Sequence, residues 1–92
     1  MSASVHACRV YQIDYDTVGI NGWSRIEDFI RFLCKQQFDG VEGIWISENE
    51  EDIEIDFSTL EYLKNDEEWG KVIQNIIDTS DKRNAYARLA IF

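Results

Sequence analysis

The chain has 92 residues, of which 45% are hydrophobic and 13% aromatic, and its formal net charge at pH 7 is −9. That length makes one domain, residues 1–92, with no room for a second core. The hydrophobic and aromatic content excludes a disordered acidic tail. No apolar run is long enough to span a membrane, and the first residues lack the basic and apolar regions of a signal peptide, so we expect a cytoplasmic protein.

The negative charge is concentrated in one segment, residues 39–68. This segment holds twelve of the eighteen acidic residues and a single base, Lys64, so its net charge is −11. The other residues hold six acids and eight bases, a net charge of +2. Phosphates would be repelled by the acidic segment, so direct binding to nucleic acid is disfavoured. Because concentrated like charge lowers folding stability, its presence suggests a functional role.

The first half of the chain predicts one or two strands and then a helix. Residues 5–13 are rich in β-branched and aromatic residues and predict a strand, which residues 14–20 either continue or follow as a second short strand. Residues 21–22, Asn-Gly, are a turn signal. Residues 24–27 have the form of a capping box, in which a carboxylate follows a hydroxyl by three residues. Apolar residues then recur at helical spacing and predict an amphipathic helix over residues 24–36.

The acidic segment contains a predicted β-hairpin. Residues 44–47 and 53–57 form its two strands, and residues 48–52 form its acidic tip. Apolar and acidic residues alternate in the second strand, which places Glu54 and Asp56 on the solvent side. These two carboxylates project from the same face, about 7 Å apart.

The last third predicts helices and a closing strand. Residues 58–61 repeat the capping-box pattern and open a short helical turn. Residues 65–68 begin a further helix with acids in its first turn, and residues 69–77 carry its apolar stripe. Residues 84–92 predict a final strand. The order predicts an α+β fold, an antiparallel or mixed sheet of four to five strands with two to three helices on one face. A ferredoxin-like βαββαβ core with an added N-terminal strand fits this order.

Catalytic and metal-binding signals are weak. His6 and Cys8 would share a strand face, but no third member or oxyanion hole accompanies them, so we expect a non-catalytic protein. Residues 50–61 imitate the ligand spacing of a calcium loop, but Ile55 stands where the sharp turn needs glycine. Cys8 and Cys34 fit reduced, packed thiols. We therefore expect no metal, no cofactor and no disulfide.

The acidic side chains themselves form the candidate site. Capping by Glu27, Glu61 and Glu68 explains part of the acidity, but it does not explain the hairpin. The acids on the hairpin form a row. The acids near the starts of two helices flank this row. Among the aromatic residues, Trp45 could anchor a protein partner. The predicted partner-binding residues are Trp45, Glu48, Glu50, Glu51, Asp52, Glu54, Asp56, Glu61, Asp66, Glu67 and Glu68.

In these features the chain resembles the small acidic proteins of bacteriophages that mimic DNA, namely anti-restriction proteins and some anti-CRISPR inhibitors. The shared features are small size, one acidic domain, no catalytic groups, and carboxylates carried on strands and helices. Residues 39–68 carry the resemblance. It implies an inhibitor that occupies the DNA-binding cleft of a restriction enzyme or other nuclease. Many such proteins are dimers, and the C-terminal strand would offer an edge for pairing with a second copy.

Two other classes of function remain open. An immunity protein or antitoxin would also be small and acidic, and would cover the basic active site of a cognate nuclease toxin. A regulatory or adaptor domain could use the hairpin and Trp45 for a partner unrelated to nucleic acid. A mimic should compete with DNA and bind less tightly as salt rises. An immunity protein should neutralise one toxin, and an adaptor should tolerate charge reversal over the hairpin.

Overall fold

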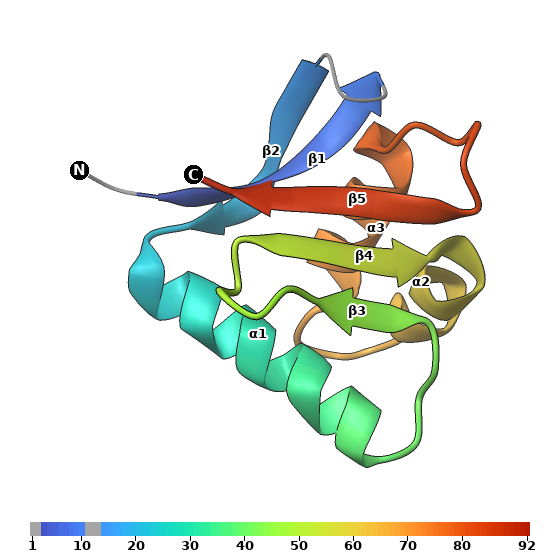
Figure 1. Ribbon diagram of the computed structural model, residues 1–92. Helices are drawn as coiled ribbons and strands as arrows, with labels where there is room; N and C mark the ends of the chain where they lie inside the picture. The colour runs from blue at the N-terminus through green and yellow to red at the C-terminus, as the bar shows by residue number, and fades with distance from the viewer. Residues whose placement is uncertain (1–2, 11–13) are drawn as a thin grey trace.

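The chain folds into one five-stranded sheet with its helices packed on one face (Figure 1). The structure, a computed structural model, describes residues 3–10 and 14–92. The strands are β1 (Ser4–Val10), β2 (Asp14–Asn21), β3 (Ile44–Ile46), β4 (Asp52–Asp56) and β5 (Tyr86–Ile91). The helices are α1 (Trp23–Phe38), α2 (Phe57–Leu63) and α3 (Gly70–Thr79). The predicted α+β class is confirmed.

The strand order is β2-β1-β5-β4-β3, and each neighbouring pair is antiparallel. A ferredoxin-like core would instead place the strands that precede its two helices side by side. Here β2 and β4, which precede α1 and α2, are separated by β1 and β5, because the N-terminal hairpin brings β1 next to β5. The strand order therefore differs from the ferredoxin-like arrangement that we expected.

The C-terminal strand lies in the middle of the sheet. β5 pairs with β1 on one side and with β4 on the other. The prediction that this strand offers a pairing edge to a second copy is therefore wrong. The edges of the sheet are β2 and the three-residue β3.

Most predicted boundaries are close to the observed ones. The second short strand predicted over residues 14–20 is confirmed as β2. Of the strand predicted over residues 5–13, residues 11–13 lie outside the described residues. The predicted hairpin is confirmed as β3 and β4, but Phe57 begins α2 instead of ending β4.

Apolar alternation explains which face of the sheet the helices cover. On β4, Ile53 and Ile55 are fully buried, whereas the alternate residues Asp52, Glu54 and Asp56 are not. They pack in one core with Phe29 of α1 and Ile73 and Ile76 of α3. Each such side chain contributes about 1.5–3 kcal/mol through its burial. The opposite face carries none of the described helices and is called the open face below; Figure 1 looks onto it, with α3 behind.

Both predicted capping boxes are wrong. α1 begins at Trp23, one residue before Ser24, and α2 begins at Phe57, one residue before Ser58. Neither helix has a side-chain hydrogen bond at its N-cap. Thr59, the next residue in the second box, is buried and donates its hydroxyl to the carbonyl of Glu42 at 2.7 Å. The hydroxyl-to-carboxylate spacing therefore falls inside these helices and does not mark their starts.

The helix start predicted at residues 65–68 is wrong, because α3 begins at Gly70 and has no acid in its first turn. The Asp66 carboxylate accepts hydrogen bonds from the backbone N–H groups of Glu68, at 3.0 Å, and Trp69, at 2.8 Å. These bonds hold the turn that leads into α3, which begins at Gly70. Asp66 therefore has a structural role.

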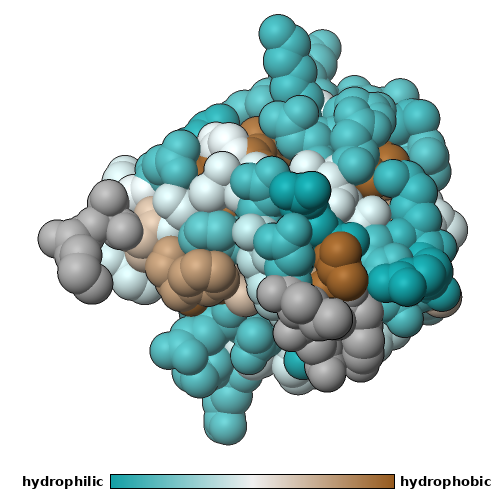
Figure 2. Space-filling model, turned by 90° about the horizontal axis from the view of Figure 1, so that it is seen from above, coloured by the Kyte–Doolittle hydropathy of each residue, from teal (hydrophilic) through white to brown (hydrophobic). Residues whose placement is uncertain are grey.

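Exposed large hydrophobic side chains are scattered over the described surface. Trp23 and Phe38 lie at the two ends of α1, and Tyr62 lies on α2. Seen from above, on the side of β1 and β2, the molecule is mainly hydrophilic with separate hydrophobic patches (Figure 2). No described helix is long and apolar enough to cross a membrane.

Gly43, just before β3, is the glycine that the fold needs most. Its φ is +84°, and a Cβ there would fall on the Thr59 hydroxyl and 2.8 Å from Asp56 Oδ2.

We expect Gly43→Ala to lower the free energy of unfolding by about 3 kcal/mol, the sum of backbone strain and overpacking. Gly40→Ala is the control, because its φ is +94° but the added Cβ meets nothing within 4 Å. Urea denaturation of Gly40→Ala should show that the free energy of unfolding falls by only about 1 kcal/mol. Equal losses would contradict the predicted clash.

Candidate functional site

The β3–β4 hairpin presents a row of carboxylates on the open face. Because Ile53 and Ile55 point into the core, Asp52, Glu54 and Asp56 project the other way. Consecutive members of this row are about 7 Å apart. In the pairing register Trp45 lies opposite Glu54, and its side chain is 51% exposed. The predicted hairpin geometry is therefore confirmed, with an exposed indole beside the row.

The turn between the two strands is held by Ser47. Its hydroxyl oxygen accepts hydrogen bonds from the backbone N–H groups of Glu51, at 3.2 Å, and Asp52, at 3.0 Å. The same hydroxyl donates to Asn49 Oδ1 at 2.8 Å. The Glu51 carbonyl also accepts the N–H of Ile91 at 2.9 Å. The acidic tip is therefore fixed to the sheet by a network that sequence reasoning missed.

Glu50 occupies a backbone conformation that favours glycine. It is the one non-glycine residue with positive φ, at 60°, among those described. Its side chain is exposed, and Glu48 and Glu51 are close to it in the sequence. We expect Glu50→Gly to raise the free energy of unfolding by about 1 kcal/mol through relief of strain and of like-charge repulsion. Thermal unfolding measures this change, and Glu67→Gly, which also removes an exposed charge, is the control. A lower melting temperature for Glu50→Gly than for the native chain would contradict the strain argument.

Six carboxylates of the hairpin, called the hairpin acids below, form no ion pair within 4 Å of any described residue. They are Glu48, Glu50, Glu51, Asp52, Glu54 and Asp56. Six acids elsewhere in the described chain form ion pairs, whereas six others form none: Glu27, Glu42, Asp66, Glu67, Glu68 and Asp78. The ion pairs are Arg9 with Asp14 and Asp16, Arg31 with Asp28, Lys35 with Asp39, Lys64 with Glu61, and Arg83 with Asp81. Five of the nine bases thus pair with acids outside the hairpin, and none of the nine pairs with a hairpin acid.

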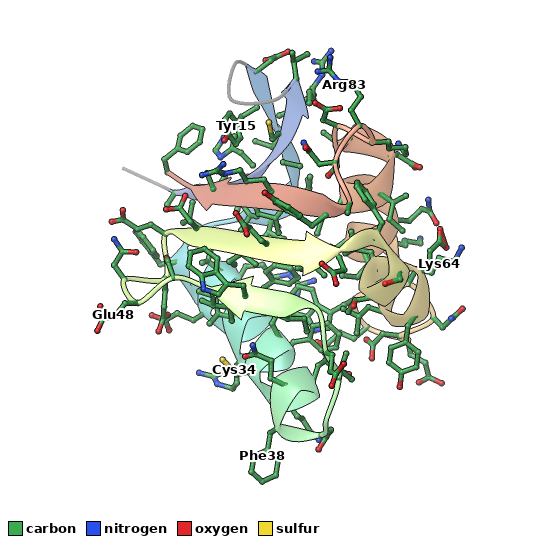
Figure 3. All side chains as sticks on the ribbon, turned by 45° about the vertical axis from the view of Figure 1, so that its right-hand side comes forward. Tyr15, Cys34, Phe38, Glu48, Lys64 and Arg83 are labelled. Carbon is green, nitrogen blue, oxygen red and sulfur yellow. The ribbon has the colours of Figure 1, made fainter. Side chains whose placement is uncertain are left out.

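The remaining predicted site residues lie apart from this row. Glu61 is on α2 and pairs with Lys64. Figure 3 shows Glu48, at the hairpin tip, and Lys64 at opposite ends of the molecule. Glu68 lies in a groove against α1, close to Arg31. Glu67 and Glu68 therefore belong to the helix layer, and the prediction that they flank the row is wrong, because the turn before α3 lies on the other side of the sheet.

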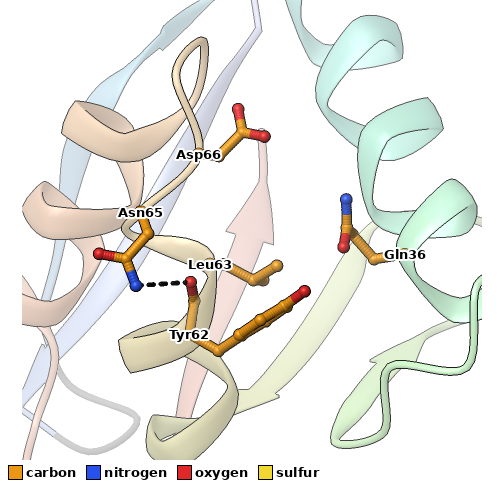
Figure 4. Close-up of a pocket in the computed structure, with 5 residues that line it drawn as sticks. All are labelled: Gln36, Tyr62, Leu63, Asn65 and Asp66. Carbon is orange, nitrogen blue, oxygen red and sulfur yellow. Dashed lines mark hydrogen bonds between the residues drawn. The ribbon is translucent and has the colours of Figure 1, made fainter.

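A cavity of about 200 Å³ lies between α1 and the connection from α2 to α3 (Figure 4). Gln36, Tyr62, Leu63, Asn65 and Asp66 line it. Asn65 donates its side-chain N–H to the Tyr62 carbonyl at 3.2 Å. The one predicted site residue here, Asp66, already accepts two backbone N–H groups. This cavity is thus part of the helix connection and is separate from the hairpin acids.

His6 and Cys8 have separate structural partners. The His6 ring stacks on Phe92, with centroids 3.8 Å apart and planes 6° from parallel. The buried Cys8 thiol donates to the Val10 carbonyl at 3.2 Å. Burial raises the pKa of Tyr15 above its ordinary value, and its interaction with Cys8 adds to the rise.

Neither of the two cysteines, both in the described part of the chain, forms a disulfide. Cys34 is exposed on α1 and not packed as predicted, because it lies on the outer side of the helix. Among the described residues, no group of three His, Cys, Asp or Glu side chains could hold a metal ion.

Comparison with protein-family models, curated proteins and solved structures finds no match for the chain.

Proposed function

We propose that this protein is a non-catalytic inhibitor that mimics the charge of DNA and occupies the nucleic-acid-binding site of a basic protein, such as a restriction enzyme or other defence nuclease. The observation that carries this proposal is the concentration of the hairpin acids: residues 48–56 hold six acids and no base, and none of the six forms an ion pair with a described residue. The same chain neutralises acids at five other places with nearby bases. A surface that served only solubility would have no reason for this segregation.

The geometry of the hairpin supports a charge mimic. Asp52, Glu54 and Asp56 span about 14 Å in a straight row. One strand of DNA carries a charge for about every 3.4 Å of helix axis, so the row alone has about half that density. The tip acids Glu48, Glu50 and Glu51 extend the row at one end. Because Ser47 fixes the tip, little ordering entropy is lost when a partner binds.

Binding assays on a captured target would test the proposal. Proteins retained from a bacterial lysate at increasing salt would be identified by mass spectrometry, and the retained nucleases purified. We expect duplex DNA to displace the protein from such a nuclease in the absence of Mg²⁺, and the affinity to fall as salt rises. A nuclease that binds the protein and duplex DNA at the same time would contradict mimicry. The proposed site of action is the cytoplasm of the host cell.

An immunity protein is the second candidate, and the exposed Trp45 favours it. An aromatic side chain inside an acidic surface is typical of a specific protein interface. The number of targets separates the two functions. A mimic should inhibit several unrelated DNA-binding enzymes, whereas an immunity protein should neutralise a single toxin.

A further inference from the structure

Two aromatic side chains flank the carboxylates of the open face. Trp45 on β3 lies opposite Glu54, and Tyr86 on β5 lies opposite Asp56, so the rings stand on the two strands beside β4. Together with Gly43 and Ile44, these four residues line a groove of about 190 Å³. Pockets for drug-sized ligands measure roughly 300–1,000 Å³. The groove is therefore sized for one long side chain.

No described base of the chain occupies this groove. Neither Glu54 nor Asp56 has an ion-pair partner within 4 Å in the described part of the chain. Arg88 is nearest in the register, opposite Glu54 on β5. Its guanidinium forms no ion pair with a described acid. The groove thus keeps two carboxylates with no described cation within 4 Å.

We propose that the groove receives an arginine side chain of the protein partner, with the guanidinium between Trp45 and Tyr86 and hydrogen-bonded to Glu54 and Asp56. This inference rests on the proposed function and adds the chemistry of one contact. Strands on either side of β4 are about 10 Å apart, which leaves room for a planar group with contacts of about 3.5–4 Å on each side. Arginine fits better than lysine because it stacks on aromatic rings and bonds carboxylates through a fork of N–H groups.

Short peptides test the proposal directly. The probes are three acetylated, amidated pentapeptides, Gly-Ser-X-Ser-Gly, in which X is arginine, lysine or the neutral analogue citrulline. The indole N–H signals of the three tryptophans report binding by NMR. We expect the arginine peptide to shift the Trp45 signal and leave Trp23 unchanged, and the lysine peptide to bind about 2- to 5-fold more weakly. Equal binding of the arginine and citrulline peptides, or no shift at Trp45, would overturn the proposal.

Variants place the peptide in the groove. Trp45→Ala and Tyr86→Leu should each weaken arginine-peptide binding about 2- to 5-fold. Trp23→Ala is the control, since Trp23 is 58% exposed but lies at the start of α1. Because Tyr86 is half-buried, Tyr86→Leu also changes the packing around it. Tyr86→Phe keeps the ring and should preserve binding. Equal weakening by Trp23→Ala, or none by Trp45→Ala, would overturn the assignment.

These results separate the groove from the proposed function. If the arginine peptide enters the groove but the captured nuclease is not displaced by DNA, the groove assignment stands and DNA mimicry fails. If the protein and DNA compete for the nuclease, but the nuclease binds Trp45→Ala as tightly as the native chain, mimicry stands and the groove assignment is overturned. A Trp45 shift that depends on protein concentration without peptide would assign the groove to a second copy of this chain and overturn an arginine of another protein as its occupant.

Discussion

Replacement of the six hairpin acids by their amides should abolish target binding and leave the fold more stable than before. Six surface charge contacts of about 0.5–1 kcal/mol each amount to about 3–6 kcal/mol, or about 10²- to 10⁴-fold in affinity. Removal of like charges from one hairpin should raise the free energy of unfolding by about 1 kcal/mol, which is a few degrees in melting temperature. Fluorescence anisotropy with the captured nuclease and thermal unfolding measure the two effects.

A control variant with the same net charge separates the hairpin from the charge of the whole protein. It carries amides at six exposed acids elsewhere, Asp14, Asp16, Glu27, Asp28, Asp39 and Asp78, so that both variants have a net charge of −3. We expect this control to bind nearly as well as the native chain. Equal losses in both variants would assign the effect to long-range attraction. Unchanged binding in the hairpin variant would mean that its acids are an ordinary solvated surface.

Local patterns in the sequence were sufficient for the elements but not for their arrangement. The alternation in residues 53–57 and the apolar stripe of residues 69–77 each reflect one buried face, so strand and helix were predicted correctly. Strand order depends on pairing between distant segments. β5 pairs with β1 across most of the chain length, and no local signal encodes that contact. The capping boxes failed because Ser24 and Ser58 have the right spacing inside helices that had already begun.

The candidate site was predictable where it depends on one strand. The sides of Glu54 and Asp56 follow from alternation within β4. Tyr86 was missed because its position in the site depends on β5 lying beside β4, although the period of two in the last strand does indicate its face. Which acids form ion pairs also depends on the fold: Arg9 and Asp14, for example, lie on neighbouring strands. Sequence reasoning could count the acids but could not determine which have bases nearby.

Two phenylalanines on α1 should differ most in their effect on stability. Phe29 is fully buried, with its ring centroid 5.4 Å from that of Trp69, whereas Phe38 is 91% exposed. We expect Phe29→Ala to lower the free energy of unfolding by about 3–5 kcal/mol through lost burial and a cavity. A domain of this size has about 5–14 kcal/mol in total. Phe38→Ala, the same change on the same helix, should alter stability by about 0.5 kcal/mol or less. Urea denaturation measures both.

Target binding by the folded fraction of Phe29→Ala distinguishes a preformed surface from one that the partner orders. The hairpin acids are fixed by Ser47 and by pairing with β5, not by direct contact with Phe29. If they act as a rigid surface, affinity corrected for the folded fraction should match that of the native chain. A further loss of affinity after this correction would show that packing beneath the sheet sets the geometry of the row. Destabilised protein that still binds fully would thus place the function in the hairpin and the stability in the core, as separate properties of one small domain.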